Sequence, residues 1–278
     1  MALESALITH GFAPPANLDI AQRMEAAVRE EAVLPATIAI IDGKAHIGLS
    51  NDTLVRLAAD RDAHKVSLRD LPIVLAQGHS GGTTVAATMY LAHRAGIRVF
   101  ATGGIGGVHR DHPEDVSADL TALATIPIIT VCAGAKAILD LERTLQVLET
   151  HGVPVIGYGT DEFPAFYSRQ SGLSVDAQVN APEEIARVAQ ERQALGLSAA
   201  ILVCVPVPQA DELAALDAET AIEEAVAEAE EAGIGGKALT PYLLGRMVEL
   251  TGGRARLANE ALLLNNARTA ARIARALR

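Results

Sequence analysis

Residues 126–158 read IPIITVCAGAKAILDLERTLQVLETHGVPVIGY, and this stretch decides the fold class. Its first part, 126–134, is a continuous apolar run that predicts a buried strand. The helical pattern of 135–152 ends at Gly152, a residue type that is common just after helices. A second apolar run at 153–158 predicts another strand. A strand, a helix and a strand in this order predict a right-handed crossover between two parallel strands.

The same alternation of strands and helices extends over residues 96–206. Further apolar strands in this region include IRVFATGGIGG (97–107) and SAAILVCVPVP (198–208). This alternation predicts an α/β fold with a mainly parallel sheet that is flanked by helices on both faces, an α/β/α arrangement. The last third is mostly helical and is expected to pack back onto this sheet, with predicted helices at 182–195, 217–232, 240–251 and 256–277. Without a repeat or a linker-like stretch, the sequence predicts one domain over residues 1–278.

Three patterns precede this region. Residues 17–32 have helical spacing of apolar side chains. Residues 36–49, ATIAIIDGKAHIGL, predict two strands joined at Asp42-Gly43, a type I′ hairpin signal. Residues 81–95, GGTTVAATMYLAHRA, predict an apolar helix that opens with glycines and threonines.

Composition excludes several classes of protein. The chain has 278 residues, is 50% hydrophobic and carries a formal net charge of −11, which argues against binding nucleic acid or an anionic membrane surface. No apolar run reaches about 18 residues, so we expect no membrane span, and MALESALITHGF lacks the pattern of a signal peptide. Cys132 and Cys204 lie in apolar strand-like runs and are predicted to be buried, reduced thiols.

Lys136 follows a buried strand and stands at the expected start of a helix. A cation is disfavoured there, because helix N-termini carry partial positive charge. The helix dipole and the loss of hydration would both favour the neutral amine, which attacks carbonyls and sugar C1 positions and forms Schiff bases. A lysine that reaches out to solvent is the alternative, and spacing alone leaves both open.

Two glycine-rich loops are candidate anion sites. TGGIGGVHR (102–110) follows a strand, but His109 occupies the third glycine position of a dinucleotide-binding loop. Its backbone amides could bind a phosphate, or its glycines could serve a tight turn. GHSGGTTVA (78–86) lacks the Gly-Lys-Ser/Thr of a nucleotide-binding P-loop. It could place an anion at a helix N-terminus, or Thr83 or Thr84 could cap that helix.

The segment RDHPEDVSADL (110–120) crowds Asp111, Glu114, Asp115 and Asp119 together. It is either a solvated loop that caps a helix or a site for a hard divalent cation with mostly water ligands. Three single residues complete the candidates, each with an ordinary surface or helical interpretation beside the functional one. They are Glu4, Lys65, which could bind phosphate, and Asn259.

Ten stretches together resemble one family. They are ESALITHGF, PATIAIIDGKAHIGL, KVSLRDLP, GGTTVAATM, FATGGIGGVHR, DVSADLTALA, VCAGAKAILDL, LETHGVPVIGYGTDEFPAFY, TPYLLGRMVELTGG and NEALLLNNA, in order from residue 3 to about residue 272. The chain is similar in them to pseudouridine-5′-phosphate glycosidases. The resemblance implies reversible cleavage of the C–C glycosidic bond of pseudouridine 5′-phosphate, giving uracil and ribose 5-phosphate. It also implies a cytoplasmic homotrimer with an α/β fold and a divalent metal, commonly Mn²⁺.

Site residues follow from the same resemblance. Lys136 corresponds to the nucleophile, Glu4 to the proton donor and Asp115 to the metal ligand. The substrate contacts are Lys65, Val85, Thr102, His109, Ser117, Ala118, Asp119 and Asn259. In the implied mechanism Glu4 protonates the ribose ring oxygen and Lys136 attacks C1′. An iminium at C1′ draws electrons as the C–C bond breaks, and water then hydrolyses the Schiff base.

Departures from the family pattern leave the aglycone open. VPVPQ (205–209) stands where the family commonly reads Asn-Pro-Ile-Pro-Glu, so Val205 removes a polar group, and SAL replaces STI after Glu4. The family also usually has a further segment before ALES. C-glycosynthases that join ribose 5-phosphate to an aromatic polyketide, and relatives from indigoidine biosynthesis, share these motifs. An oxidoreductase is disfavoured by the failed glycine pattern, and a non-catalytic sugar-phosphate-binding protein would require Lys136 or Glu4 to be dispensable.

Overall fold

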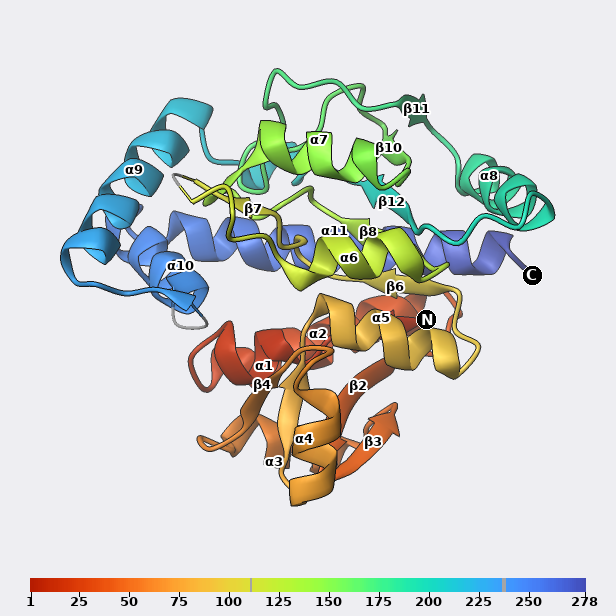
Figure 1. The fold of residues 1–278 in the computed structure, drawn as a ribbon, viewed down its shortest axis with the longest axis horizontal. Coiled ribbons are helices and arrows are strands. Elements are labelled where there is room, and N and C mark those ends of the chain that lie inside the picture. Colours follow the sequence, from red (N-terminus) through yellow and green to blue (C-terminus); the bar gives the residue numbers. More distant parts are fainter. Residues whose placement is uncertain (111, 237–238) are drawn as a thin grey trace.

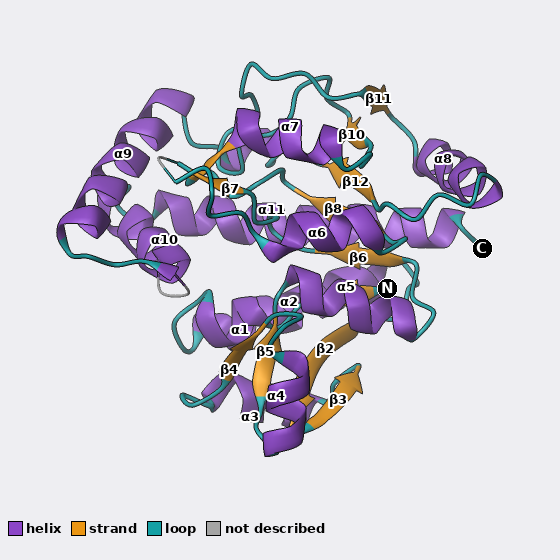
Figure 2. Ribbon diagram, viewed as in Figure 1, coloured by secondary structure: helices purple, strands orange, loops and turns teal. Residues whose placement is uncertain are grey.

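A computed structural model describes residues 1–110, 112–236 and 239–278, and its centre is a ten-stranded sheet (Figures 1 and 2). Its strands are β1 (Ala2–Leu3), β2 (Ala36–Ile41), β3 (Lys44–Ile47), β4 (His64–Val66), β5 (Gly81–Thr83), β6 (Val99–Ala101), β8 (Ile129–Cys132), β10 (Val155–Tyr158), β11 (Ala177–Val179) and β12 (Ile201–Cys204). Their order is β11-β10-β12-β8-β6-β1-β2-β5-β4, with β3 paired to β2. Two short strands, β7 (Val108–His109) and β9 (Leu139–Asp140), form a separate pair.

Helices cover both faces of the sheet. They are α1 (Ala6–His10), α2 (Ala16–Glu30), α3 (Asn51–Ala59), α4 (Leu71–Gln77), α5 (Val85–Arg94), α6 (Ala118–Thr125), α7 (Leu141–Thr150), α8 (Pro182–Ala194), α9 (Ala215–Glu231), α10 (Leu239–Leu250) and α11 (Arg254–Ala276). Helices α5, α6 and α7 lie side by side on one face, and α11 crosses the other face between α2 and α8 (Figure 1). The predicted α/β/α class, with a helical C-terminal portion packed on the sheet, is confirmed.

Strands β6, β8, β10, β11 and β12 pair in parallel, as the alternation of strands and helices predicts. All residues of β8 and β12 are buried, which explains their uninterrupted apolar sequences. Cys132 pairs in register with Cys204, and both thiols are free and buried, as expected. The antiparallel hairpin of β2 and β3 is also confirmed, with positive φ at Asp42 (48°) and Gly43 (71°).

The helix predicted over 81–95 begins later than expected, because residues 81–83 form strand β5 and α5 starts only at Val85. The glycines serve close packing of this strand rather than the opening of a helix. A Cβ atom on Gly82 would lie 2.3 Å from Oγ1 of Thr9 and 2.6 Å from the carbonyl oxygen of Ser5.

The helix predicted directly after residue 134 is also displaced. Helix α7 starts at Leu141, and the side chain of Asp140 caps it by accepting a hydrogen bond from the Arg143 amide at 3.0 Å. Residues 133–138 form a loop, and Leu139 and Asp140 pair with β7. Lys136 therefore lies in a loop rather than at a helix N-terminus, and the predicted effect of the helix dipole on its amine is wrong.

Within the described ranges, no helix is long and apolar enough to cross a membrane.

Candidate active site

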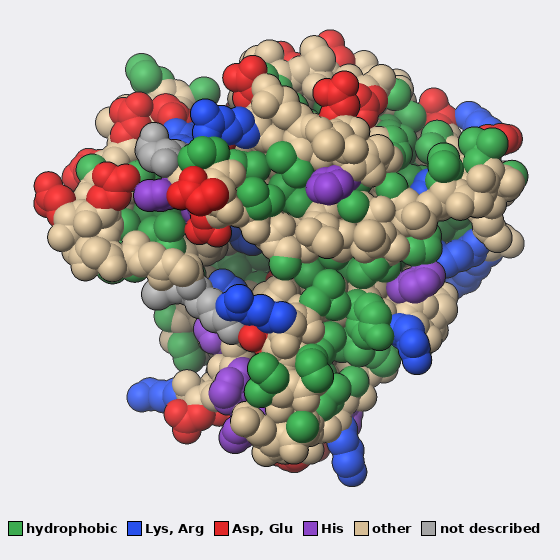
Figure 3. Space-filling view, in the orientation of Figure 1, with side chains coloured by type: hydrophobic (Ala, Val, Ile, Leu, Met, Phe, Trp, Pro, Cys, Tyr) green, Lys and Arg blue, Asp and Glu red, His purple; other side chains and the backbone are tan. Residues whose placement is uncertain are grey.

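Several predicted site residues follow the carboxyl ends of parallel strands. Glu4 comes directly after β1, Thr102 after β6, and the loop with Lys136 after β8. Because β1, β6 and β8 are neighbouring parallel strands, these residues meet at one edge of the sheet. The surface is hollowed between the part that carries α10 and the part that carries α4, with charged and histidine side chains around the hollow (Figure 3).

Two adjoining cavities lie at this edge. We call them the first cavity, of about 570 Å³, and the second cavity, of about 1550 Å³, both open to solvent. They adjoin because Glu4, Lys65 and Lys136 line both of them. The first cavity also contains Thr102 and Asn259. The second also contains the other predicted residues: Val85, His109, Asp115, Ser117, Ala118 and Asp119. The structure thus brings every predicted site residue together.

Burial and neighbouring groups shift the pKa of the Glu4 carboxyl group in opposite directions. Burial is the largest effect and raises its pKa above the usual value of 4.5. The positive charge of Lys136 and a hydrogen bond donated by Oγ1 of Thr102 to Oε1 of Glu4 oppose this rise. Because burial prevails, the neutral acid is favoured beyond its usual pH range, which suits a proton donor.

The backbone around Lys136 is fixed on both sides. The Lys136 amide donates to the Ile105 carbonyl at 3.1 Å, and the Leu139 amide donates to the Lys136 carbonyl at 3.0 Å. Gly134 has a φ of +83°, and a Cβ atom there would lie 2.2 Å from the carbonyl oxygen of Pro164. Only glycine fits such a position. The side chain of Lys136 is half-buried and lines both cavities.

Asp119 occupies the backbone amides that the sequence suggested for an anion. Its Oδ1 accepts from the Ala86 amide at 3.0 Å, near the start of α5. Its Oδ2 accepts from the Gly106 amide of the glycine loop at 2.8 Å. These amides of the two loops therefore bind the protein's own carboxylate, which corrects the expectation that they are available to an external phosphate.

The second cavity nonetheless carries groups that suit a phosphate ester. Lys65 and Arg69 supply cations, and Ser67 and Thr84 supply hydroxyl groups. Oγ1 of Thr84 is buried and has no hydrogen-bond partner among the described residues. An unsatisfied buried hydroxyl is costly, and a ligand that pairs with it would remove that cost.

Asp115 is the only predicted metal ligand, and its surroundings limit the kind of ion it could hold. Its side chain is 54% exposed, and its Oδ2 lies 3.9 Å from Nε2 of His109. Burial lowers the pKa of His109 more than the Asp115 carboxylate raises it. Glu114 is paired instead with His112, at 3.6 Å between Oε1 and Nδ1, and Asp111 lies outside the described residues.

No cluster of three or more His, Cys, Asp or Glu side chains that could hold a metal is present in the part of the chain that the structure describes. This donor set fits a hard cation that keeps most of its water ligands and binds through one carboxylate and a substrate phosphate.

Sequence reasoning missed two residues of this edge. Phe166 has a positive φ of 62°, which is rare for a bulky residue, and its ring lines the first cavity. Asn266 of α11 is buried and donates from Nδ2 to the carbonyls of Thr102 (2.8 Å) and Gly103 (3.2 Å). Both lie in quoted family motifs, but neither has a local signal that distinguishes it from core packing.

Val205, where the sequence departs from the family, is 4% exposed, and its amide donates to the Cys132 carbonyl at 2.8 Å. It is not among the described residues that line the two cavities.

Comparison with known proteins places this geometry in a family. The family model described as indigoidine synthase A like protein matches residues 1–276. A protein of Rhodospirillum centenum named pseudouridine-5′-phosphate glycosidase is 59% identical over 276 residues, which cover 99% of this chain and 86% of that protein. A protein of the same name from Methylobacterium nodulans is 53% identical over 280 residues, covering 100% and 83% of the two chains.

Two solved structures are similar throughout. An indigoidine synthase A-like protein of Thermotoga maritima superposes with a TM-score of 0.93 at 36% identity, covering 99% of this chain and 91% of that one. The prealnumycin C-glycosynthase AlnA, solved in complex with ribulose 5-phosphate, gives a TM-score of 0.91 at 39% identity, with 99% and 90% covered.

Proposed function

The chain belongs to the family described as indigoidine synthase A like protein, and from this premise we propose that it is a pseudouridine-5′-phosphate glycosidase. The enzyme would cleave the C–C glycosidic bond of pseudouridine 5′-phosphate, reversibly, into uracil and ribose 5-phosphate. One observation carries the proposal. Glu4, with a pKa raised by burial, lines the same two cavities as Lys136.

The chemistry requires an electron sink, because carbon is a much poorer leaving group than the oxygen or nitrogen of ordinary glycosides. In the proposed first step, neutral Lys136 attacks C1′ while the bond from C1′ to the ring oxygen breaks. Glu4 gives its proton to that oxygen, so the ribose ring opens without forming a free alkoxide. Burial raises the pKa of Glu4 and so favours the neutral acid that this step uses, because the charged carboxylate loses hydration.

The attack leaves a secondary ammonium on Lys136, which gives a proton to the Glu4 carboxylate. In the second step, the freed nitrogen lone pair forms an iminium with C1′ as the bond to C5 of uracil breaks. The electron pair of that bond passes to C5, which takes up the proton from Glu4, so uracil leaves as a neutral base. Water then hydrolyses the imine, which releases ribose 5-phosphate and regenerates the free amine of Lys136.

The two cavities suit the two halves of this substrate. Lys65, Arg69 and the hydroxyls of the second cavity would bind the 5′-phosphate, at a distance from the bond that breaks. The first cavity is lined by the apolar side chains of Phe12, Phe166 and Leu263 beside the amide of Asn259. That combination fits a flat base with polar edges, so we assign the aglycone to the first cavity.

A divalent metal, expected to be Mn²⁺, would be held by Asp115 at the mouth of the second cavity. When bound, it would neutralise charge on the phosphate and order water around it. The cytoplasmic location and the homotrimer remain predictions from the family resemblance.

The experiment that tests the proposal is trapping with borohydride in the presence of ribose 5-phosphate. We expect a mass increase confined to the peptide that contains Lys136, and its loss in Lys136→Arg. Lys44→Arg is the matched control, because Lys44 lies exposed on β3, outside both cavities. Label at other lysines, or none at all, would reject the Schiff-base mechanism.

The second candidate function is C-glycosynthesis with another aglycone, which the similarity to AlnA favours. Release or consumption of uracil, measured against a panel of aromatic aglycones with ribose 5-phosphate, separates the two. Turnover of an aromatic polyketide but not of uracil would replace the glycosidase proposal.

A further inference from the structure

Arg110, which directly follows β7, contacts the loop of Lys136 and is not among the described residues that line the first or the second cavity. Its Nη2 donates to the carbonyl of Ala137 at 3.1 Å, and its Nε donates to the carbonyl of Leu139 at 3.4 Å. Both residues are buried, at 5% and 2% exposure. Buried carbonyls need a donor, so the guanidinium satisfies groups that water reaches poorly.

The same guanidinium is paired with Glu219 of α9. Nη1 lies 2.5 Å from Oε1 and Nη2 lies 3.2 Å from Oε2, a bidentate arrangement. The side chain of Arg110 is 26% exposed, so this pair is partly shielded from solvent. A planar guanidinium can serve two carbonyls and a carboxylate at once, whereas the donors of a lysine ammonium all lie on one atom.

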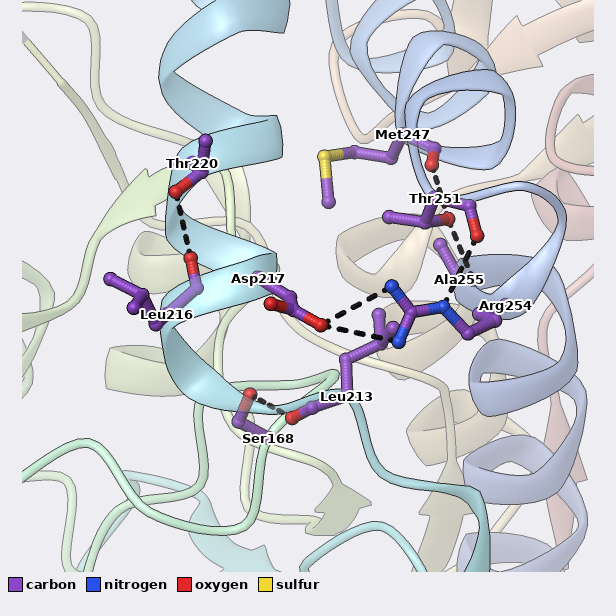
Figure 4. A network of polar contacts seen from close by, with 9 residues as sticks. All are labelled: Ser168, Leu213, Leu216, Asp217, Thr220, Met247, Thr251, Arg254 and Ala255. Atoms are coloured by element: carbon purple, nitrogen blue, oxygen red, sulfur yellow. Dashed lines mark hydrogen bonds and ion pairs between the residues drawn. The ribbon is translucent and has the colours of Figure 1, made fainter.

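Helix α9 is itself anchored at the same end. Arg254 contacts Oδ2 of Asp217 through both terminal nitrogens at 3.2 Å, and its Nε donates to the Thr251 carbonyl at 3.3 Å (Figure 4). Oγ of Ser168 donates to the Leu213 carbonyl at 2.8 Å, just before the helix begins (Figure 4). Glu219 lies two residues after Asp217 on this anchored part of α9.

The Lys136 loop is thus held from two directions. Its amide is bound to the Ile105 carbonyl, and the turn it closes is bound by Arg110. We propose that Arg110 is a positioning residue, which holds the backbone of residues 137–139 so that the Lys136 amine points at C1′ of the substrate. The inference rests on the proposed function of Lys136, since it assigns no chemical step to Arg110 itself.

The test uses the full chain and the variants Arg110→Lys and Arg110→Ala. We expect the rate of borohydride-trapped adduct formation with ribose 5-phosphate to fall about 100-fold, the usual effect of a displacement near 1 Å. Affinity for ribose 5-phosphate, measured in a Lys136→Ala background, should change less than about threefold. A trapping rate equal to that of the unmodified chain, or an equal loss of affinity, would overturn the inference.

Two variants separate positioning from general stability. Glu219→Gln removes the ion pair with Arg110 but leaves the hydrogen bonds from Arg110 to the two loop carbonyls. The rate of adduct trapping should therefore fall by less than in Arg110→Lys. Asp217→Asn removes the ion pair between α9 and Arg254 and should lower the melting temperature without slowing trapping. If Asp217→Asn slows trapping as much as Arg110→Lys does, Arg110 acts only through helix anchoring and the inference fails.

Hydrogen exchange tests the inference independently of the proposed function. Amides of residues 136–139 should exchange at least tenfold faster in Arg110→Lys than in the unmodified chain. In Asp217→Asn their exchange rates should equal those of the unmodified chain. If no adduct forms on Lys136 but this exchange pattern is found, the proposed mechanism fails while the positioning role stands. Unchanged exchange in Arg110→Lys would overturn the positioning role.

Discussion

The hydroxyl of Thr102 donates a hydrogen bond to Oε1 of Glu4, which joins the residue after β6 to the carboxylate after β1. This bond stabilises the charged form of Glu4, while burial favours the neutral form and prevails. The balance between burial and this hydrogen bond sets the pH range in which Glu4 can give up a proton.

Thr102→Val should raise the pKa of Glu4 further, because it removes a donor to the carboxylate. Activity that needs the protonated acid is lost as pH rises through this pKa, so the alkaline limb of kcat/KM should move to higher pH. Thr220→Val is the matched control, since Thr220 is exposed and bonds only a carbonyl within α9. An alkaline limb that moves to lower pH in Thr102→Val would contradict the assignment of Glu4 as the proton donor.

Asp119→Asn should act in the opposite direction. The charge of Asp119 raises the pKa of Glu4, so its removal should lower that pKa and move the same limb to lower pH. An asparagine has only one acceptor oxygen, so either the Ala86 or the Gly106 amide loses its partner. The free energy of unfolding should fall by about 1–3 kcal/mol. Denaturant unfolding and the pH profile measure the two effects separately.

Glu4→Gln should lower kcat by about 10²- to 10⁴-fold, the usual contribution of a positioned acid. The amide is similar in size and can still accept from Thr102, so substrate affinity should be retained. Stopped-flow release of uracil measures kcat, and equilibrium binding of ribose 5-phosphate measures affinity. Undiminished turnover would exclude Glu4 as the proton donor.

Gly106→Ala should disrupt the site through crowding. Its Cβ atom would lie 2.2 Å from Oγ of Ser117 and 2.9 Å from Oδ2 of Asp119, so the loop must move. We expect a loss of about 1–3 kcal/mol in stability and a large loss of activity. Gly245→Ala is the control, because nothing lies within 4 Å of its Cβ position in α10. It should stabilise the chain by about 0.5–1 kcal/mol.

Removal of divalent metal with a chelator should abolish turnover, and Mn²⁺ should restore it. In Asp115→Asn the concentration of Mn²⁺ needed for half-maximal activity should rise at least tenfold, because a carboxylate is the better ligand for a hard cation. Glu114→Gln should leave this concentration unchanged, since Glu114 pairs with His112 instead. Full activity of the chelated enzyme would remove the metal from the proposal.

The layered α/β architecture is predictable from the amino-acid sequence. Uninterrupted apolar runs such as Ile129–Cys132 and Ile201–Cys204 suit strands covered on both faces, and this pattern is local along the chain. The turn at Asp42-Gly43 was equally predictable, because positive φ angles restrict residue choice at those positions. The family motifs indicated the candidate site residues, which the strand ends then bring to one edge.

The exact bounds of the elements and the long-range contacts of the site depend on the three-dimensional fold. Residues 81–83 become a strand because they pair with β2 and β4, and α1 packs against Gly82. The start of α7 moves to Leu141 because Leu139 and Asp140 pair with β7. The contacts of Asp119 and Arg110 join residues that are distant in sequence. Such contacts depend on which strands become neighbours in space, and the local periodicity of a sequence does not specify that order.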